Sequence, residues 1–304
     1  AGPPAVSAPP SPPPPHPTAV SEDAVPGPAP PLAPSPLAPS PGPSPVPSLP
    51  VCFTVDYEPD CPPYHTHTHR GIEHGTGPLL ALLAAHGVRS TFFSTGEVAE
   101  RYPDAIRAIL SAGHELGCHG HTHRRFDAMS PADARGEIVA SSAVLRRHAP
   151  VDAFRAPNLV LPDAYLPLLE AEGYALDSSA AKYKLPYWRA RLRRGGRERS
   201  AGTGSAGAGS VGAGAGAPRL VRIPASTTSS VLRLARPVRE ALLARLAGPV
   251  VLFVHPWEFV DWRHTDLRLD CRFATGATAL RRVRASLRFL AARGAAFVPM
   301  RELR

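Results

Sequence analysis

The sequence predicts an α/β protein with parallel strands, and three observations carry the prediction. Short apolar runs alternate with stretches whose apolar residues recur at the 3.6-residue spacing of a helix. Glycines stand between expected helices and the strands that follow them, where helix C-caps belong: Gly87, Gly113, Gly173 and Gly294. Strand–helix alternation of this kind implies parallel strands with right-handed crossovers. Because chemistry collects at the C-terminal ends of such strands, functional motifs should directly follow them.

Each expected element rests on its own pattern. The apolar runs typical of strands are 51–56, 90–93, 153–157, 174–177, 220–223, 250–255 and 295–300. Helical patterns fill the intervals at 78–85, 97–111, 131–147, 163–172, 231–246 and 277–292. The leucines at 79, 80, 82 and 83 show the helical period in the first of these, and Leu280, Val283, Leu287 and Leu290 show it in the last.

Low-complexity sequence divides the chain. Of the 38 prolines, 21 fall within the first 50 residues, and residues 1–49 consist mainly of Pro, Ala and Ser. Such a segment cannot bury enough apolar surface to offset its ordering entropy, so it is expected to be a disordered, extended linker. Residues 50–304 are then expected to form one catalytic domain, which a Gly/Ala/Ser insertion interrupts at about 195–218.

Composition excludes some classes of function. The 34 basic and 25 acidic side chains give a net charge of +9, but six arginines crowd into 189–199 instead of spreading along a face with interleaved aromatics. This disfavours a nucleic-acid binder. No apolar run approaches the roughly 20 residues that a membrane span needs. No secretory signal is visible, which leaves localisation open. The four cysteines lack metal or disulfide spacing and are expected to be buried thiols.

An acidic pair follows the first expected strand. Asp56 and Glu58 are two residues apart, so on an extended segment their carboxylates point the same way and could share one site. Carboxylates that close repel each other unless a cation lies between them. A solvated acidic turn is the alternative interpretation.

Three histidines follow the apolar segment 115–118. In a helical turn His119 and His123 would share one side while His121 points away, whereas in an extended segment all three would share a face. Histidine is the commonest side-chain metal ligand, so either geometry predicts metal binding here. A second histidine run, at positions 65, 67 and 69, follows no strand and is expected to be a mobile or substrate-facing loop.

Three further polar residues stand at strand ends. Arg155 could form a charge-assisted pair with one of the carboxylates, although a surface arginine is the simpler alternative. Asp177 closes the next strand, where helix N-capping is an alternative role. His255, held by the following proline, is a candidate general acid.

Taken in order, these segments resemble the five motifs of the polysaccharide deacetylases, the NodB-homology metal-dependent carbohydrate esterases that act on chitin, peptidoglycan and nodulation factors. The motifs are FTVDYE at 53–58, CHGHTH at 118–123, FRAP at 154–157, LDSS at 176–179 and LFVH at 252–255. The resemblance extends from about 51 to 303 outside the insertion. It implies a distorted (β/α) barrel that binds one divalent metal, usually zinc.

The resemblance also implies a role for each matching residue. Asp56 matches the catalytic base, Arg155 its partner, His255 the general acid, and Asp177 the carboxylate that tunes this histidine. His119 and His123 match the metal-binding histidines. The backbone N–H of Asn158 matches an oxyanion donor, and Leu252 matches the lining of the pocket for the acetyl methyl group.

The sequence departs from the family pattern at two motifs. Adjacent aspartates are usual, whereas here Tyr57 separates Asp56 from Glu58, as in the branch with some peptidoglycan deacetylases and metal-independent cyclic amide hydrolases. Glu58 is therefore the expected third ligand, with Asp60 in reserve. The fourth motif lacks its usual tryptophan, and Tyr183, Trp188 or Trp257 could supply that aromatic wall.

The expected function is the metal-dependent removal of N-acetyl or O-acetyl groups from a polysaccharide or oligosaccharide. A cell-envelope or extracellular polymer fits the proline-rich arm, although a cytoplasmic enzyme of polymer synthesis fits the sequence as well. The alternatives are another C–N hydrolase acting on a ureide or cyclic amide, a catalytically inactive carbohydrate-binding relative, and a nucleic-acid binder. A pure binding protein would need neither the base nor the acid.

Overall fold

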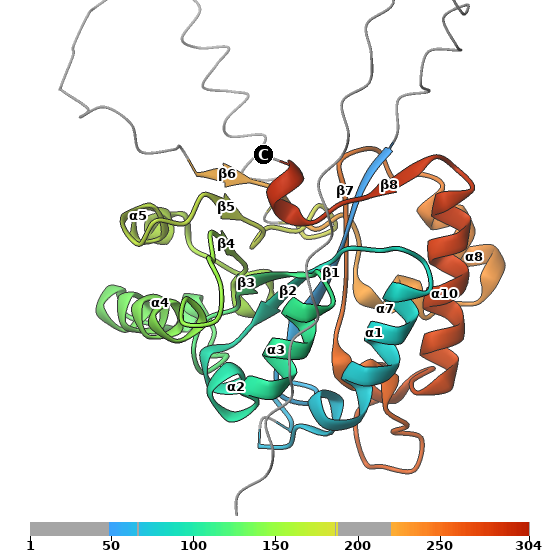
Figure 1. The fold of residues 1–304 in the computed structure, drawn as a ribbon, viewed down its shortest axis with the longest axis horizontal. Helices are drawn as coiled ribbons and strands as arrows, with labels where there is room; N and C mark the ends of the chain where they lie inside the picture. The colour runs from blue at the N-terminus through green and yellow to red at the C-terminus, as the bar shows by residue number, and fades with distance from the viewer. Residues whose placement is uncertain (1–48, 66, 186, 188–219, 304) are drawn as a thin grey trace, which may run out of the picture. The chain divides into compact units, whose positions relative to one another are not determined.

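The structure, a computed structural model, describes residues 49–65, 67–185, 187 and 220–303 (Figure 1). The expected linker therefore lies outside the described residues except for Leu49, which already belongs to the first strand. The expected insertion at 195–218 lies outside them as well. Of the helices that the structure describes, none combines the length and apolar character that a membrane crossing requires.

The core of the domain is a parallel sheet of eight strands in the order β6-β5-β4-β3-β2-β1-β7, with β8 also paired to β1. The strands are β1 (Leu49–Tyr57), β2 (Thr91–Ser94), β3 (Glu115–Cys118), β4 (Ala153–Phe154), β5 (Leu176–Asp177), β6 (Val221–Arg222), β7 (Val250–Val254) and β8 (Ala295–Phe297). This curled sheet confirms the expected α/β class and the barrel-like fold.

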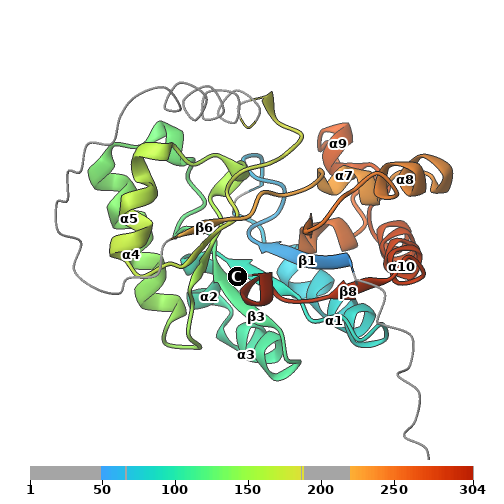
Figure 2. The same cartoon turned by 90° about the horizontal axis from the view of Figure 1, so that it is seen from above.

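Helices lie around the outside of the sheet, with α4 and α5 on one side and α8 and α10 on the other (Figure 2). The α-helices are α1 (Thr76–Ala84), α2 (Gly96–Arg101), α3 (Pro103–Ser111), α4 (Pro131–Leu145), α5 (Leu166–Ala171), α7 (Ser229–Leu232), α8 (Arg236–Leu243), α9 (Leu269–Arg272) and α10 (Ala277–Ala291). A single turn of π-helix, Gly71–Gly75, leads into α1.

Two of the expected helices are each divided in two. The pattern at 97–111 forms α2 and α3, which separate at Tyr102 because Pro103 begins the second helix and cannot continue the first. The pattern at 231–246 likewise forms α7 and α8, with Pro237 in the first turn of the latter. In both places proline starts a new helix where the apolar period alone suggested a continuous one.

The strands pack differently on their two faces. Along β1, Val51, Phe53 and Val55 join the large core beneath the helices. Cys52, on the opposite face, joins a smaller cluster inside the curled sheet with residues of several other strands. Since side chains alternate along a strand, Asp56 shares the inner face with Cys52. The fold thus points the side chain of Asp56 into the barrel, at the C-terminal end of β1.

Candidate active site

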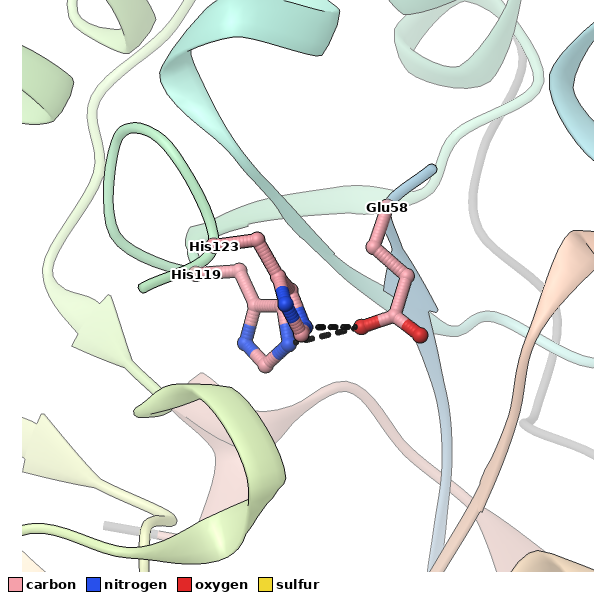
Figure 3. Close-up of side chains that lie close together, drawn as sticks. All are labelled: Glu58, His119 and His123. Atoms are coloured by element: carbon pink, nitrogen blue, oxygen red, sulfur yellow. Dashed lines mark hydrogen bonds and ion pairs between the residues drawn. The ribbon is translucent and has the colours of Figure 1, made fainter. Parts of the chain in front are cut away.

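A glutamate and two histidines form a cluster that could hold a metal ion (Figure 3). Glu58 directly follows β1, and His119 directly follows β3. Glu58 Oε2 lies 3.2 Å from His119 Nε2 and 2.6 Å from His123 Nε2. Ligand atoms about 2.1 Å from a tetrahedral zinc ion stand roughly 3.4 Å apart. The pair at 3.2 Å is close to this separation, whereas the pair at 2.6 Å would have to widen to hold the ion. The cluster is buried, as are the three side chains themselves.

Hydrogen bonds orient the ligand atoms toward one point. His119 donates from Nδ1 to the Arg155 carbonyl at 2.8 Å, which leaves Nε2 for a metal. Trp257 Nε1 donates to Glu58 Oε1 at 3.4 Å, so Oε2 is the oxygen that faces the histidines. Although burial favours its neutral form, His123 and His255 hold the pKa of Glu58 well below its usual range. Glu58 is therefore an anion in this cluster.

The histidine loop is neither helical nor extended. Gly120 and His123 both have positive φ, 76° and 60°, so the chain folds back and brings the first and third histidines together. Their ring centroids are 5.2 Å apart. His121 instead packs against Gly96, where an added Cβ would lie 2.1 Å from the imidazole Nδ1. His121 is thus outside the ligand cluster.

Glu137 on α4 holds this loop in place, a role that the sequence analysis did not assign. Its Oε2 accepts from the backbone N–H groups of His121 and Thr122, both at 2.9 Å. Its Oε1 accepts from the Thr122 hydroxyl at 2.6 Å. A glutamate at a helical core position was the available signal, because a buried carboxylate needs partners of this kind.

Asp60, the alternative to Glu58 as third metal ligand, instead has a structural role. Its two carboxylate oxygens accept from the backbone N–H groups of Arg70 and Gly71, at 2.7 and 2.8 Å. These are orphan donors at the start of the helical segment that leads into α1. The carboxylate is fully buried in this capping position.

Asp56 and Arg155 form a buried ion pair at 2.6 Å. The same Arg155 Nη1 donates to Thr54 Oγ1, while Nη2 donates to Ser178 Oγ at 2.9 Å. The guanidinium also lies over the ring of Phe93, 4.2 Å from its centroid. Arg155 is therefore fixed inside the barrel and is not the surface arginine of the alternative interpretation.

His255 faces Asp56 and Glu58. It follows β7, and its Nε2 lies 4.0 Å from Asp56 Oδ2 and 3.6 Å from Glu58 Oε1. Its imidazole stacks on Trp257, with ring centroids 4.9 Å apart. Burial alone would lower the pKa of His255, but the carboxylates of Glu58, Glu258 and Asp56 raise it to about 9. An imidazolium at this place suits proton donation.

The carboxylate that partners His255 is Glu258, and this corrects the prediction for Asp177. His255 Nδ1 donates to Glu258 Oε1 at 2.7 Å, because a 3₁₀ turn at Pro256–Phe259 brings this side chain back. Glu258 is fully buried and pairs with the buried Arg233 at 3.2 Å. Burial would raise the pKa of Glu258, but Arg233 and His255 lower it.

Asp177 stabilises a neighbouring turn instead. Its Oδ1 accepts from the backbone N–H of Ser179 at 2.9 Å, and its Oδ2 pairs with Arg222 Nε at 2.8 Å. Ser179 Oγ in turn accepts from the backbone N–H of Ala156, next to Arg155. Asp177 thus acts on the site through the loop after β5.

A cavity of about 360 Å³ opens onto these groups. Its walls include Asp56, Glu58, His123, Asn158, Leu159, Phe253, His255 and Trp257. Leu252 is absent from this wall, which corrects the prediction for the methyl pocket: its side chain lies in the core beneath the helices. Since side chains alternate along β7, its neighbour Phe253 is the one that faces the cavity.

The turn after β4 contributes Asn158 and Leu159 to the cavity wall. Asn158 and Leu159 have φ of 58° and 53°, a left-handed conformation that asparagine tolerates better than most residues. Lys184 donates to the Asn158 carbonyl and so braces the turn from outside. Tyr183 and Trp257 both line the cavity and could serve as its aromatic wall, whereas Trp188 lies outside the described residues.

The second histidine run is not part of this wall. His65 and His67 stack on each other with ring centroids 5.8 Å apart, and His65 also lies near Trp262. His69 contacts Tyr102. Among the residues that the structure describes, the potential metal cluster is confined to Glu58, His119 and His123.

Comparison with known proteins finds a family to which part of this chain is similar. Residues 46–176 match the family profile of the polysaccharide deacetylases. Over 87 residues the chain is 31% identical to a peptidoglycan-N-acetylglucosamine deacetylase of Bacillus cereus, which is 29% of this chain and 30% of that protein. The chain therefore matches about a third of the length of this curated relative. The match covers less than half of the chain, and over residues 46–176 the chain is similar to the polysaccharide deacetylases.

Solved structures show the same fold. A family 4 carbohydrate esterase from Streptomyces lividans, in complex with acetate, superposes with a TM-score of 0.51 at 17% identity, over 82% of this chain and 91% of that one. A family 4 pseudoenzyme from Bacillus anthracis gives a TM-score of 0.53 at 13% identity, over 84% of this chain and 66% of that one. The fold is thus shared by an esterase and a pseudoenzyme, so the fold alone does not show whether a protein is catalytically active.

Proposed function

We propose that the protein is a metal-dependent deacetylase that removes N-acetyl groups from a polysaccharide or oligosaccharide of the cell envelope. One observation carries the proposal: a carboxylate fixed by a buried arginine and an imidazole fixed by a buried glutamate face each other across 4.0 Å beside the three-ligand cluster. Hydrolysis of an amide needs a proton acceptor for water and a proton donor for the amine.

The metal ligands in this proposal are Glu58, His119 and His123, with zinc as the ion that a carboxylate and two imidazoles suit best. When bound, such an ion polarises a carbonyl and makes water more acidic. All further steps belong to side chains and backbone groups of the chain itself.

Asp56 removes a proton from the attacking water, and Arg155 keeps its carboxylate aimed at the cavity. The backbone N–H of Asn158 donates to the oxyanion that forms on the acetyl carbonyl. His255 delivers a proton from Nε2 to the leaving amine nitrogen, while Glu258 holds the opposite ring nitrogen. Phe253 and Leu159 supply the apolar wall beside the acetyl methyl group.

The substrate class is inferred from the relative and from the cavity. The matched Bacillus cereus protein carries the name of a peptidoglycan N-acetylglucosamine deacetylase. The exposed aromatic side chain of Tyr183 on the cavity wall provides a surface on which a sugar ring can stack. An N-acetylglucosamine polymer is the first substrate to assay.

The proposal is tested by acetate release from N-acetylglucosamine oligomers and peptidoglycan, with zinc restored after chelation. We expect His119→Ala to lose both metal and turnover. His255→Ala should keep the metal, since it leaves the three ligands intact, and lose about 10²–10⁴ in rate. If His255→Ala hydrolyses the oligomers at the parent rate, the assignment of the acid is wrong.

Two further assays address the alternatives. Allantoin as substrate tests the cyclic amide and ureide hydrolases that share the D-x-E arrangement, and turnover of allantoin without acetate release would replace the proposal. An absent or salt-insensitive gel shift with DNA and RNA would dismiss nucleic-acid binding. A protein that binds glycans and zinc but releases no acetate from any of the polymers would be an inactive relative.

A further inference from the structure

We propose that Cys61 and Cys271 form a reversible disulfide that fastens one wall of the cavity. The two residues are 210 positions apart in the chain, yet both belong to one small buried cluster with Trp257, Trp262 and their neighbours. Both also line the cavity. The two side chains lie close enough for each thiol to shift the pKa of the other.

The bridge would join two segments that meet at the cavity. Cys61 begins the turn Cys61-Pro62-Pro63-Tyr64, three residues after Glu58 at the end of β1. Cys271 lies in α9, whose backbone is held by Arg233 through the carbonyls of Asp270 and Phe273. A second contact joins the same segments, because Arg268 donates to the Tyr64 hydroxyl. The two thiols therefore meet where the chain is already held together.

The electrostatics of the pair suit thiol–disulfide exchange. Interaction with the Cys271 side chain and burial both raise the pKa of Cys61. The same interaction lowers the pKa of Cys271, so Cys271 is the thiol that loses its proton first. Thiolates are the reactive species in this chemistry. Cys271 is accordingly the attacking group, and it is also the more exposed of the two, at 7% against 1%.

The reaction with a small dialkyl disulfide balances in two steps. The Cys271 thiolate attacks one sulfur of the reagent, forms a mixed disulfide and releases one small thiolate. Cys61 then gives up its proton to solvent and attacks the Cys271 sulfur, which releases the second small thiolate and forms the Sγ–Sγ bond. Two protein thiols are oxidised while one reagent disulfide is reduced to two thiols.

The other two cysteines provide an internal control. Cys52 and Cys118 are both fully buried, and burial raises the pKa of each thiol. Cys52 lies inside the curled sheet, and Cys118 donates to Ser141 Oγ beneath α4. We expect both to stay reduced in the folded protein.

The test treats the folded protein with cystamine and then counts free thiols after unfolding in denaturant. We expect two thiols after treatment and four after reduction. Trypsin should release Leu269–Arg272 linked to the fragment that contains residue 61, and chymotrypsin, which cleaves after Phe53 and Tyr57, separates Cys61 from Cys52. Cystamine should also raise the melting temperature by several degrees, and reductant should reverse this shift.

Variants and alternative outcomes keep the test decisive. Cys61→Ser should leave Cys271 without a bridge and abolish the melting-temperature shift, whereas Cys52→Ala should keep both the bridge and the shift. Four free thiols after treatment, a bridge between another pair, or a stable cysteamine adduct on Cys271 without a bridge would each overturn the proposal. The thiol count on the parent protein decides the matter even if a variant fails to fold.

Discussion

At the scale of single residues, the chemistry depends on which carboxylate holds the imidazole of His255. The structure gives this place to Glu258, which is fully buried and itself paired with Arg233. Removing the charge of Glu258 while keeping its shape weakens its hold on the His255 imidazole, and it also takes the counter-charge from the buried Arg233. Glu258→Gln keeps that shape.

We expect Glu258→Gln to lower turnover of N-acetylglucosamine oligomers about tenfold or more while metal content is unchanged. Asp177→Asn is the matched comparison, because Asp177 pairs with Arg222 and Ser179 instead. Its turnover should stay within a few-fold of the parent rate. Steady-state kinetics of both variants measure the difference, and the reverse order would restore Asp177 as the partner of His255.

The residues of the site illustrate what sequence alone can supply. Glu58, His119 and His123 directly follow strands or lie within five positions of one, so their convergence could be predicted from parallel topology. The partner of His255 could not, because a 3₁₀ turn brings Glu258 back over three residues. The prediction for the cavity wall at β7 named Leu252, one residue before the Phe253 that lines the cavity. Because successive side chains of a strand point to opposite faces of the sheet, an error of one residue selects the wrong face.

At the scale of elements, the site depends on how closely the helix after the acidic motif packs on the turn after β7. A Cβ added at Gly75 would lie 2.2 Å from the Pro256 carbonyl oxygen, and one added at Gly71 would lie 2.4 Å from the Trp257 nitrogen. Both neighbours are backbone atoms, which cannot rotate away. The turn that carries His255 and Glu258 is thus positioned by two glycines.

Gly75→Ala should therefore lower the free energy of unfolding by about 1–3 kcal/mol, because the helix and the turn must move apart. Gly77→Ala on α1 is the control, since an added Cβ there meets nothing within 4 Å. That variant should be neutral or more stable by up to about 1 kcal/mol, the usual gain of alanine over glycine in a helix. Urea unfolding of the two variants measures both effects, and equal midpoints would contradict the packing argument.

Elements were predicted better than their ends. The period of the apolar residues located α4 and α10 closely, whereas Pro103 and Pro237 divided two other expected helices. The strands β4, β5 and β6 are only two residues long in the structure. Pairing with neighbouring strands sets the length of a strand, and sequence periodicity does not contain this information.

At the scale of the whole molecule, a bound ion would link distant parts of the chain. Glu58 belongs to the end of β1, while His119 and His123 belong to the loop after β3. A ligand that binds only the folded state stabilises it in proportion to the logarithm of its concentration. The stability of the protein should therefore depend on the metal.

Zinc at 100 times its dissociation constant should stabilise the fold by about 2.7 kcal/mol, and a chelator should remove this gain. His119→Ala should lose the response. His121→Ala should retain it, because His121 packs on Gly96 outside the ligand cluster. Thermal unfolding with and without zinc provides the measurement, and an unchanged midpoint for the parent protein would argue against a metal at this place.

The central position of β1 has one more consequence. β1 is paired with β2, β7 and β8, so it is held on both sides, and β7 is its direct neighbour. Asp56 lies near the end of β1 and His255 follows β7, which means that the gap between these two side chains derives from a single interstrand spacing of about 4.8 Å. The distance between Asp56 and His255 is therefore set by the pairing of two neighbouring strands and does not depend on the loops that form the rest of the cavity wall.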